Sequence, residues 1–197
     1  MATIRVATAG DAQAMADIYA PVVQHTAITF ELVPPTEADM AARMSSGLAY
    51  APWLVAVVGG EVAAFAYGAR HRERPAYQWS VDVSVYVAER HRRRGAGRAL
   101  YAALLPILRR QGFHAVHGGI TMCNPGSIAL HEAVGFRRIG VFPSVGYKRG
   151  AWHDVGWWQM ALGERVPEPA PPVPFAELRE SAAVDEALRA GAGLLRG

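Results

Sequence analysis

The sequence predicts an α+β fold, and three features carry this prediction. Two apolar, β-prone runs, from Trp53 to Val58 and from Val62 to Gly68, are joined by Gly59-Gly60, a combination typical of a hairpin with a tight turn. Apolar residues at three- and four-residue steps, the spacing of one buried helical face, mark helices before and after this hairpin. Strand and helix patterns thus follow one another along a chain in which we find no internal repeat.

The segment before the hairpin predicts one strand and two helices. Polar and apolar residues alternate from Thr3 to Ala7, as in a short strand, and the helix after it extends to about Gln24. A second helix is expected from Glu37 to Met44, with Thr36 as its N-cap.

The segment after the hairpin predicts four more strands and two more helices. The strands are expected at Trp79 to Val87, Ala115 to Met122, Arg137 to Phe142 and Asp154 to Leu162. One helix extends from about Gly97 to Arg110, and a short one, capped by Ser127, reaches Val134.

The chain divides into one domain, residues 1–163, and a tail, residues 164–197. Five prolines between Pro167 and Pro174 predict a stiff, extended linker that cannot join the interior of a sheet. The segment from Phe175 to Leu195 is rich in Ala, Glu and Leu, which predicts a peripheral helix.

Composition narrows the class of protein. No segment has the roughly eighteen apolar residues of a membrane span, and the N-terminus lacks a signal-peptide pattern, so we expect a cytoplasmic protein without a membrane partner. Its single cysteine, Cys123, excludes an internal disulfide and a thiolate metal cluster, and no metal is expected. The net charge of +3 makes nucleic acid a weak candidate partner.

The arginine excess is nevertheless local, and it surrounds a glycine pattern. Five arginines lie within nine residues: Arg90, Arg92, Arg93, Arg94 and Arg98. The pattern Arg92-x-x-Gly95-x-Gly97 lies between a predicted strand and a predicted helix, where free N–H groups of the first helical turn and guanidinium groups suit a phosphate. A solvated turn with a glycine cap is the alternative, and Walker A and dinucleotide fingerprints are absent.

The same pattern resembles the coenzyme A pyrophosphate loop of the GNAT superfamily of N-acetyltransferases. The segment from Asn124 to Phe136, Asn-x-x-Ser-x-x-x-His-Glu-x-x-Gly-Phe, is similar to a second segment of that superfamily. Blocks such as Pro52 to Ala56, Val85 to Val87 and Trp152 to Gly156 bring the chain closest to its phosphinothricin and methionine sulfoximine N-acetyltransferase group. The resemblance spans roughly residues 4–162 and implies a mixed, mostly antiparallel central sheet with helices on both faces.

The resemblance implies acetyl-CoA as co-substrate. Main-chain groups of Val85 and Val87 would hold the pantetheine arm by β-type pairing. The remaining residues that it implies for coenzyme A are Arg92, Arg93, Arg94, Gly95, Ala96, Gly97, Arg98, Asn124 and Ser127.

The resemblance also implies two catalytic residues. Asp82 occupies the position at which the phosphinothricin group has a glutamate, so it is the expected base for the acceptor ammonium. Its side chain is shorter by roughly 1.5 Å, which allows a bridging water. His131 falls where many members place a tyrosine that protonates the departing thiolate. A plain strand-edge carboxylate and a structural histidine are the alternatives.

Three residues are expected at the acceptor: Phe30, Arg74 and Tyr77. Arginine with tyrosine suits an amino acid that bears a carboxylate and a phosphinate, sulfone or sulfoximine group. The resemblance therefore implies acetyl transfer to such a small amine in a ternary complex, by an enzyme that forms a homodimer. Transfer to another small amine or a peptide N-terminus is the alternative, and a non-catalytic acyl-CoA-binding protein is a third hypothesis. RNA binding by Arg90 to Arg98 is a fourth.

Overall fold

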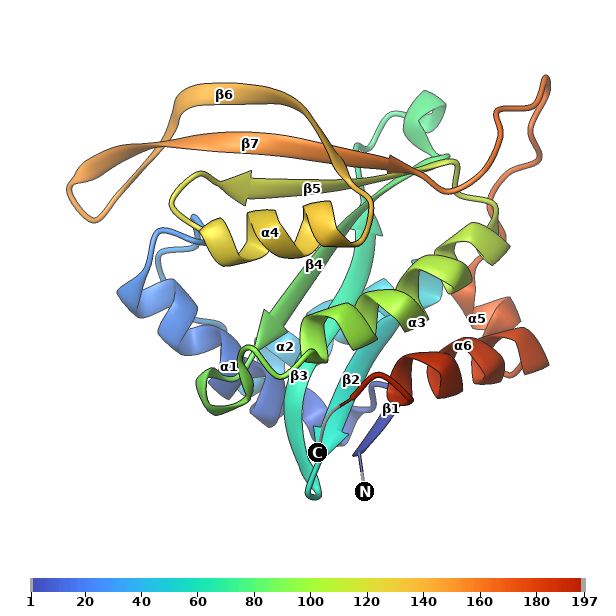
Figure 1. Cartoon of the computed structure of the whole chain (residues 1–197), viewed down its shortest axis with the longest axis horizontal. Coiled ribbons are helices and arrows are strands. Elements are labelled where there is room, and N and C mark those ends of the chain that lie inside the picture. The colour runs from blue at the N-terminus through green and yellow to red at the C-terminus, as the bar shows by residue number, and fades with distance from the viewer. Residues whose placement is uncertain (1, 196–197) are drawn as a thin grey trace.

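The computed structural model describes residues 2–195 and confirms the mixed α+β fold. A seven-stranded sheet has the order β1-β2-β3-β4-β5-β7-β6, and β4 with β5 forms its parallel pair (Figure 1). The strands are β1 (Ala2–Val6), β2 (Trp53–Val58), β3 (Glu61–Arg70), β4 (Ser80–Val87), β5 (Ala115–Thr121), β6 (Arg137–Lys148) and β7 (Ala151–Ala161). The helices are α1 (Ala12–His25), α2 (Glu37–Tyr50), α3 (Ala96–Gln111), α4 (Pro125–Ala133), α5 (Phe175–Leu178) and α6 (Ala182–Ala192).

Helices cover both faces of the sheet, as expected. Helices α3 and α6 share one buried core with β1 to β5 and β7, while α1 and α2 pack on the opposite face against β2, β3 and β4 (Figure 1). Successive side chains along a strand point to opposite faces of the sheet, which produces the two cores. On β4, Val81 and Val83 face α3, whereas Tyr86 packs on the α1 side.

Several boundaries differ from the sequence-based expectation. Helix α2 continues past Met44 to Tyr50, because Gly47 leaves room for the indole of Trp53, which a Cβ at that position would strike. Strands β6 and β7 are longer than predicted and form a hairpin, in which exposed polar and apolar residues hide the strand signal. Tertiary packing supplies the pairing that local pattern did not reveal.

Helix α4 has a different cap from the one predicted. The N-cap is Asn124, whose side-chain oxygen accepts a hydrogen bond from the Ser127 amide at 3.2 Å, and Pro125 takes the first helical position. Ser127 therefore lies inside the first turn and does not cap it.

The tail forms two helices instead of one, and it packs on the domain. Phe175, Val184 and Ala187 are buried in the same core as α3. The proline-rich linker stays outside the sheet, as predicted, and hydrogen bonds hold it, including one from Val173 N to the Gln111 carbonyl at 2.7 Å. Helix α6 also approaches α3 closely at Gly191, whose added Cβ would lie 2.7 Å from the Ala99 carbonyl oxygen. The segment is thus less peripheral than its composition suggested.

Candidate active site

The parallel pairing of β4 with β5 is short, and it opens the sheet. Only Ser80, Val81 and Asp82 of β4 pair with β5, and the last pair joins Asp82 to His117. Beyond this point β4 stays paired with β3 and β5 stays paired with β7. The edge of β4 after Asp82 therefore presents free backbone groups, which an extended ligand can use.

A cavity of about 560 Å³ lies beside this free edge of β4. Its walls come from β4, the turn before α3, the first turn of α3, and α4, with two side chains from the α1 region. The lining residues are Val22, Ile28, Val85, Tyr86, Val87, His91, Arg92, Arg93, Gly95, Ala96, Gly97, Arg98, Asn124, Gly126, Ser127, Ala129 and Leu130.

The first turn of α3 lines one end of this cavity. Gly95 is the N-cap, with a left-handed φ of 86°, and Arg93 before it also has a positive φ of 61°. These conformations turn the chain so that the free N–H groups of the first turn face the cavity. An added Cβ at Gly97 would lie 2.8 Å from Leu130 Cδ2, so a larger residue there would require the Leu130 side chain to move.

The cavity unites nearly all residues predicted to bind coenzyme A. Of those eleven residues, all except Arg94 line it, and Arg94 is exposed outside. Their individual roles in binding stay predictions. Sequence reasoning missed Ala129 and Leu130, although they lie one helical turn beyond Asn124 and Ser127. It had no signal for Val22 and Ile28, because only tertiary packing brings them to α4.

Asp82 lies where β4 and β5 begin to diverge, outside the cavity lining. Its Oδ1 is 2.6 Å from Nδ1 of His71, the residue that follows β3, and its side chain is 28% exposed. Burial raises the pKa of Asp82 above its ordinary value, and the hydrogen bond from His71 partly offsets this effect. Burial, together with the neighbouring His71, lowers the pKa of His117 to about 4. Sequence reasoning did not select His117. It assigned His71 to a loop that the resemblance turns toward the acceptor, but did not place it beside Asp82.

His131 is buried and already bonded at both ring nitrogens. Nδ1 lies 2.8 Å from the Ser127 carbonyl oxygen and Nε2 lies 2.9 Å from the Tyr101 hydroxyl. The carbonyl can only accept, so Nδ1 carries the proton and Nε2 accepts from the hydroxyl. Burial lowers the pKa of His131, which favours the neutral ring. The ring joins α4 to α3, and its role as the acid stays a prediction.

Replacement of His131 by leucine is expected to destabilise the fold by about 1 to 3 kcal/mol, because the buried Tyr101 hydroxyl loses its partner. Urea unfolding measures this effect. The Tyr101→Phe/His131→Leu double variant is the control, since removing both polar groups should restore part of the loss. Full stability in the single variant would contradict the buried hydrogen bond. If His131 is also the acid, kcat of the folded enzyme falls in both variants that lack it.

None of the three predicted acceptor residues lines the cavity beside β4. The Tyr77 ring stands edge-on to His71, with centroids 5.8 Å apart, so it lies near Asp82. Arg74 is the exposed N-cap of the short turn that contains Tyr77. Phe30 packs instead on the β6–β7 hairpin against Gly146 and His153. Contact of these residues with an acceptor stays a prediction.

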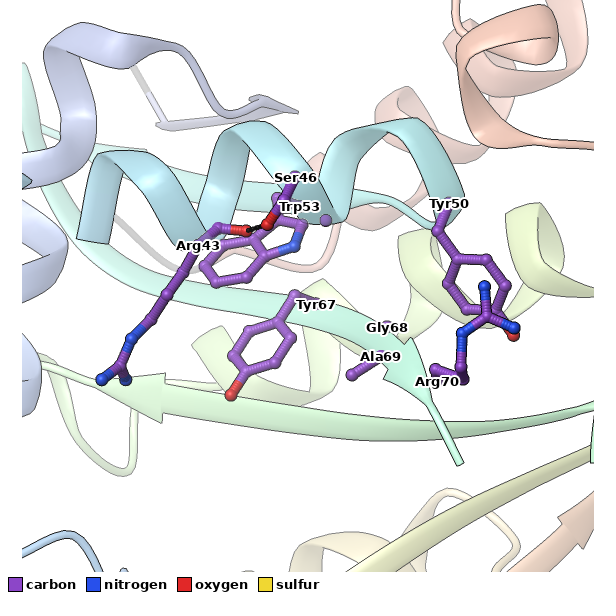
Figure 2. A pocket seen from close by; sticks show the side chains of 9 residues that line it. Arg43, Ser46, Tyr50, Trp53, Tyr67, Gly68, Ala69 and Arg70 are labelled. Atoms are coloured by element: carbon purple, nitrogen blue, oxygen red, sulfur yellow. Dashed lines mark hydrogen bonds between the residues drawn. The ribbon is translucent and has the colours of Figure 1, made fainter. Parts of the chain in front are cut away.

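A second cavity, of about 400 Å³, lies between α2 and β3 and was not anticipated (Figure 2). Arg43, Ser46, Gly47 and Tyr50 contribute from α2, together with Trp53, Tyr67, Gly68, Ala69 and Arg70. The rings of Trp53 and Tyr67 stack at 4.1 Å, and the Arg70 guanidinium lies 4.7 Å from the Tyr50 ring centroid (Figure 2). Ala69 pairs with Asp82 on β4, so this cavity and Asp82 share one face of the sheet.

Together these features describe a site for an extended ligand with phosphates and for a proton transfer. The helix terminus and arginines suit phosphates, the free strand edge suits an amide-bearing chain, and the carboxylate beside an imidazole can accept a proton. Within residues 2–195, no helix is both long enough and apolar enough to cross a membrane. The expectation that no metal is needed stays a prediction.

Comparison with known proteins agrees with this description. A family model for an acetyltransferase (GNAT) domain matches residues 4–157. A phosphinothricin N-acetyltransferase from Streptomyces viridochromogenes is 40% identical over 170 residues, which cover 86% of this chain and 92% of that protein. An L-methionine sulfoximine/L-methionine sulfone acetyltransferase from Salmonella typhimurium is 34% identical over 165 residues, covering 83% of this chain and 96% of the relative.

A solved structure extends the similarity to the fold. The GNAT superfamily phosphinothricin acetyltransferase from Sinorhizobium meliloti, solved in complex with AcCoA, superposes with a TM-score of 0.81 at 37% identity, over 86% of this chain and 93% of that one. The matched share of every chain is large, and the matching segment contains both the phosphate-binding turn and Asp82. The chain therefore belongs to the GNAT family of acetyltransferases.

Proposed function

We propose that this protein transfers the acetyl group of acetyl-CoA to the α-amine of a small amino-acid analogue, of the phosphinothricin, methionine sulfoximine or methionine sulfone type. The observation that carries the proposal is the cavity between the free edge of β4 and the first turn of α3, whose β4 wall starts three residues after the half-buried carboxylate of Asp82. Relatives named for these substrates match more than four fifths of the chain and support this acceptor class.

The cofactor half of the site follows from the cavity lining. The pyrophosphate of acetyl-CoA takes the first turn of α3, with Arg92, Arg93 and Arg98 around it. The pantetheine arm lies along Val85 and Val87 as an added strand. This arrangement points the thioester toward Asp82, three residues back along β4, at roughly 3.3 Å per residue.

Acetyl transfer proceeds in one ternary complex, with Asp82 supplying the base. The acceptor ammonium loses a proton to the Asp82 site, and the free amine attacks the thioester carbonyl. The carbon–sulfur bond then breaks and the coenzyme A sulfur takes up a proton. The raised pKa of Asp82 makes its carboxylate a stronger base than an exposed aspartate.

The acceptor binds on the α2 side of the sheet. The cavity between α2 and β3, which Arg70 lines, is on the same face of the sheet as Asp82. The Tyr77 ring stands edge-on to His71, the hydrogen-bond partner of Asp82. Guanidinium groups there, from Arg70 and the exposed Arg74, suit a carboxylate or a phosphinate.

An amine panel with a free-thiol readout tests the proposal. Saturable release of coenzyme A with phosphinothricin or methionine sulfone supports it. Turnover of peptides alone assigns the acceptor to a peptide N-terminus, and acetyl-CoA binding without any turnover identifies a non-catalytic binding protein. Nucleic-acid binding that coenzyme A does not displace would favour the RNA hypothesis.

Arg92→Ala is expected to weaken acetyl-CoA binding by roughly ten- to hundredfold, the loss of one charge-assisted hydrogen bond at a phosphate. Arg94→Ala is the matched control, because Arg94 lies outside the cavity lining. This variant should bind acetyl-CoA with wild-type affinity. Calorimetry with acetyl-CoA and with acetyl-pantetheine, which lacks the pyrophosphate, measures the effect. An equal loss with both ligands would show that Arg92 does not contact the phosphates.

We also propose a cytoplasmic homodimer. The β6–β7 hairpin supports a dimer, because β6 is an edge strand and several large apolar side chains of the hairpin are exposed. These residues are Ile139, Phe142, Val145, Tyr147 and Trp152. Sedimentation equilibrium tests the oligomeric state, and a monomer at all concentrations would contradict the proposed homodimer. The single cysteine, Cys123, is free, in keeping with a reducing compartment.

A further inference from the structure

Three ionisable side chains gather where the sheet opens. His71 follows the end of β3, Asp82 is on β4, and His117 is on β5. Each offers one donor atom, and these atoms all lie within 4.8 Å of one another. The closest contact is the hydrogen bond of 2.6 Å between Nδ1 of His71 and Oδ1 of Asp82.

Aromatic contacts fix the orientation of the His71 ring. It stacks on His117, with centroids 4.3 Å apart and planes 18° apart. The rings of Tyr77 and Trp157 stand edge-on to it at 5.8 and 5.9 Å. The side chain is 13% exposed, so its conformation is set by packing and not by solvent. His71 is therefore held with Nδ1 toward Asp82.

The geometry also determines the proton positions in this pair. An ionised carboxylate only accepts hydrogen bonds, so Nδ1 of a neutral His71 carries the proton. Nε2 then has a free lone pair, and within residues 2–195 no hydrogen bond to it is formed. A base in which a carboxylate orients Nδ1–H while Nε2 accepts a proton is the arrangement that activates nucleophiles in hydrolases.

Groups from several elements face this ring. The Asp82 carboxylate contacts it from β4. His117 from β5 is neutral at pH 7, because its pKa is lowered to about 4. Tyr77 faces it as an edge-on phenol. The adjacent Arg72 is the opposing charge, and its guanidinium lies over the Trp157 ring, 5.4 Å from the centroid.

We propose that His71 and Asp82 act together as the base of the acetyl transfer, with Nε2 of His71 as the atom that takes the proton from the acceptor ammonium. This inference rests on the proposed function and refines its assignment of Asp82. The ammonium gives one proton to Nε2, which leaves an imidazolium paired with the Asp82 carboxylate. The amine nitrogen then bonds to the thioester carbon, the carbon–sulfur bond breaks with its electron pair on sulfur, and the sulfur takes the second proton from that nitrogen. The imidazolium finally releases its proton to solvent.

The pair also compensates for the short side chain of Asp82. A direct aspartate base would have to reach the amine across the gap left by one missing carbon–carbon bond, roughly 1.5 Å. In the proposed pair the proton goes to Nε2 of His71, so the transfer does not depend on the reach of the Asp82 carboxylate.

The experiment compares pH profiles of kcat/KM for the wild type and His71→Phe, which keeps an aromatic ring in the stack. We expect kcat to fall by about 10² to 10⁴-fold and the acidic limb to move to lower pH, because the group that must lose its proton changes from an imidazole to a carboxyl group, which is ordinarily the more acidic of the two. KM for acetyl-CoA should not change. If His71 only supports Asp82, the limb moves to higher pH instead, because the hydrogen bond that lowers the pKa of Asp82 is lost. That result would overturn the proposal.

Further variants exclude the neighbouring explanations. His117→Phe keeps the stacking partner and should retain the wild-type profile, so a shift equal to that of His71→Phe would identify His117 as the titrating group. His71→Gln gives a second test if His71→Phe does not fold. EDTA should leave activity unchanged, and loss of activity that Zn²⁺ restores would show a metal site in place of the pair.

A measurement without turnover separates this inference from the proposed function. Proton NMR of the wild type should show a far-downfield Nδ1–H signal that is lost in His71→Gln and in Asp82→Ala. If that signal is present but no amine is acetylated, the proposed function is wrong, although the hydrogen bond between His71 and Asp82 is confirmed. If amines are acetylated with an unchanged profile in His71→Phe, the pair fails as the base and the function stands.

Discussion

Asp82→Asn is expected to lower kcat by about 10² to 10⁴-fold while acetyl-CoA still binds with wild-type affinity. The amide is uncharged, so it neither accepts the acceptor proton nor stabilises an imidazolium at His71. Its oxygen still accepts the hydrogen bond from His71, which keeps the local structure. The cavity for acetyl-CoA begins at Val85 and does not include Asp82. Steady-state kinetics and calorimetry measure the two effects separately.

Asp17→Asn is the matched control for this variant. It removes the same charge from an exposed position on α1, where the Asp17 side chain accepts a hydrogen bond from Gln13, so kcat should not change. A fully active Asp82→Asn enzyme would show that the base lies elsewhere. If acetyl-CoA affinity fell by the same factor as kcat, Asp82 would contribute to acetyl-CoA binding and not to proton transfer.

Phe175→Ala is expected to lower the free energy of unfolding by about 3 to 5 kcal/mol, although position 175 lies in the tail after the proline-rich linker. The Phe175 side chain is fully buried and belongs to the same core as Leu104 and Leu108 of α3. Truncation would leave a cavity that helices α3 and α5 cannot close without moving. Urea unfolding, followed by tryptophan fluorescence, measures the change.

Leu194→Ala is the control for the tail, because this side chain is 48% exposed and its truncation should change stability by less than about 0.5 kcal/mol. A small effect of Phe175→Ala would mean that the tail is not part of the cooperative unit. A separate unfolding transition of the tail at low urea concentration would place the boundary of the domain near residue 163, as the composition predicted.

The sequence alone determined the elements that local chemistry specifies. Gly59-Gly60 predicted the β2–β3 hairpin because both residues take a positive φ, which glycine adopts at no steric cost. The cap at Thr36 predicted the start of α2, and its side chain does accept from the Asp39 amide. The turn before α3 was predicted for the same reason, since Gly95 supplies the left-handed N-cap.

Predictions failed where a boundary depends on neighbours distant in sequence. Helix α2 continues to Tyr50, where Trp53 packs on Gly47. Strands β6 and β7 extend beyond their predicted bounds because they pair with each other along the hairpin. One face of the tail is buried against α3, where Gly191 lets α6 approach Ala99. A pattern of three- and four-residue steps reports that a face is apolar, but it does not report what covers that face.

The same division applies to the site. The turn predicted to bind phosphate is a continuous segment that carries its own backbone N–H groups and arginines, so the sequence by itself determined where this turn lies in the fold. The residues proposed as the base are not continuous in sequence, because the end of β3 and the starts of β4 and β5 are separated along the chain. Only the tertiary structure placed His71 and His117 beside Asp82, since the register of three neighbouring strands decides which side chains meet at the point where the sheet opens.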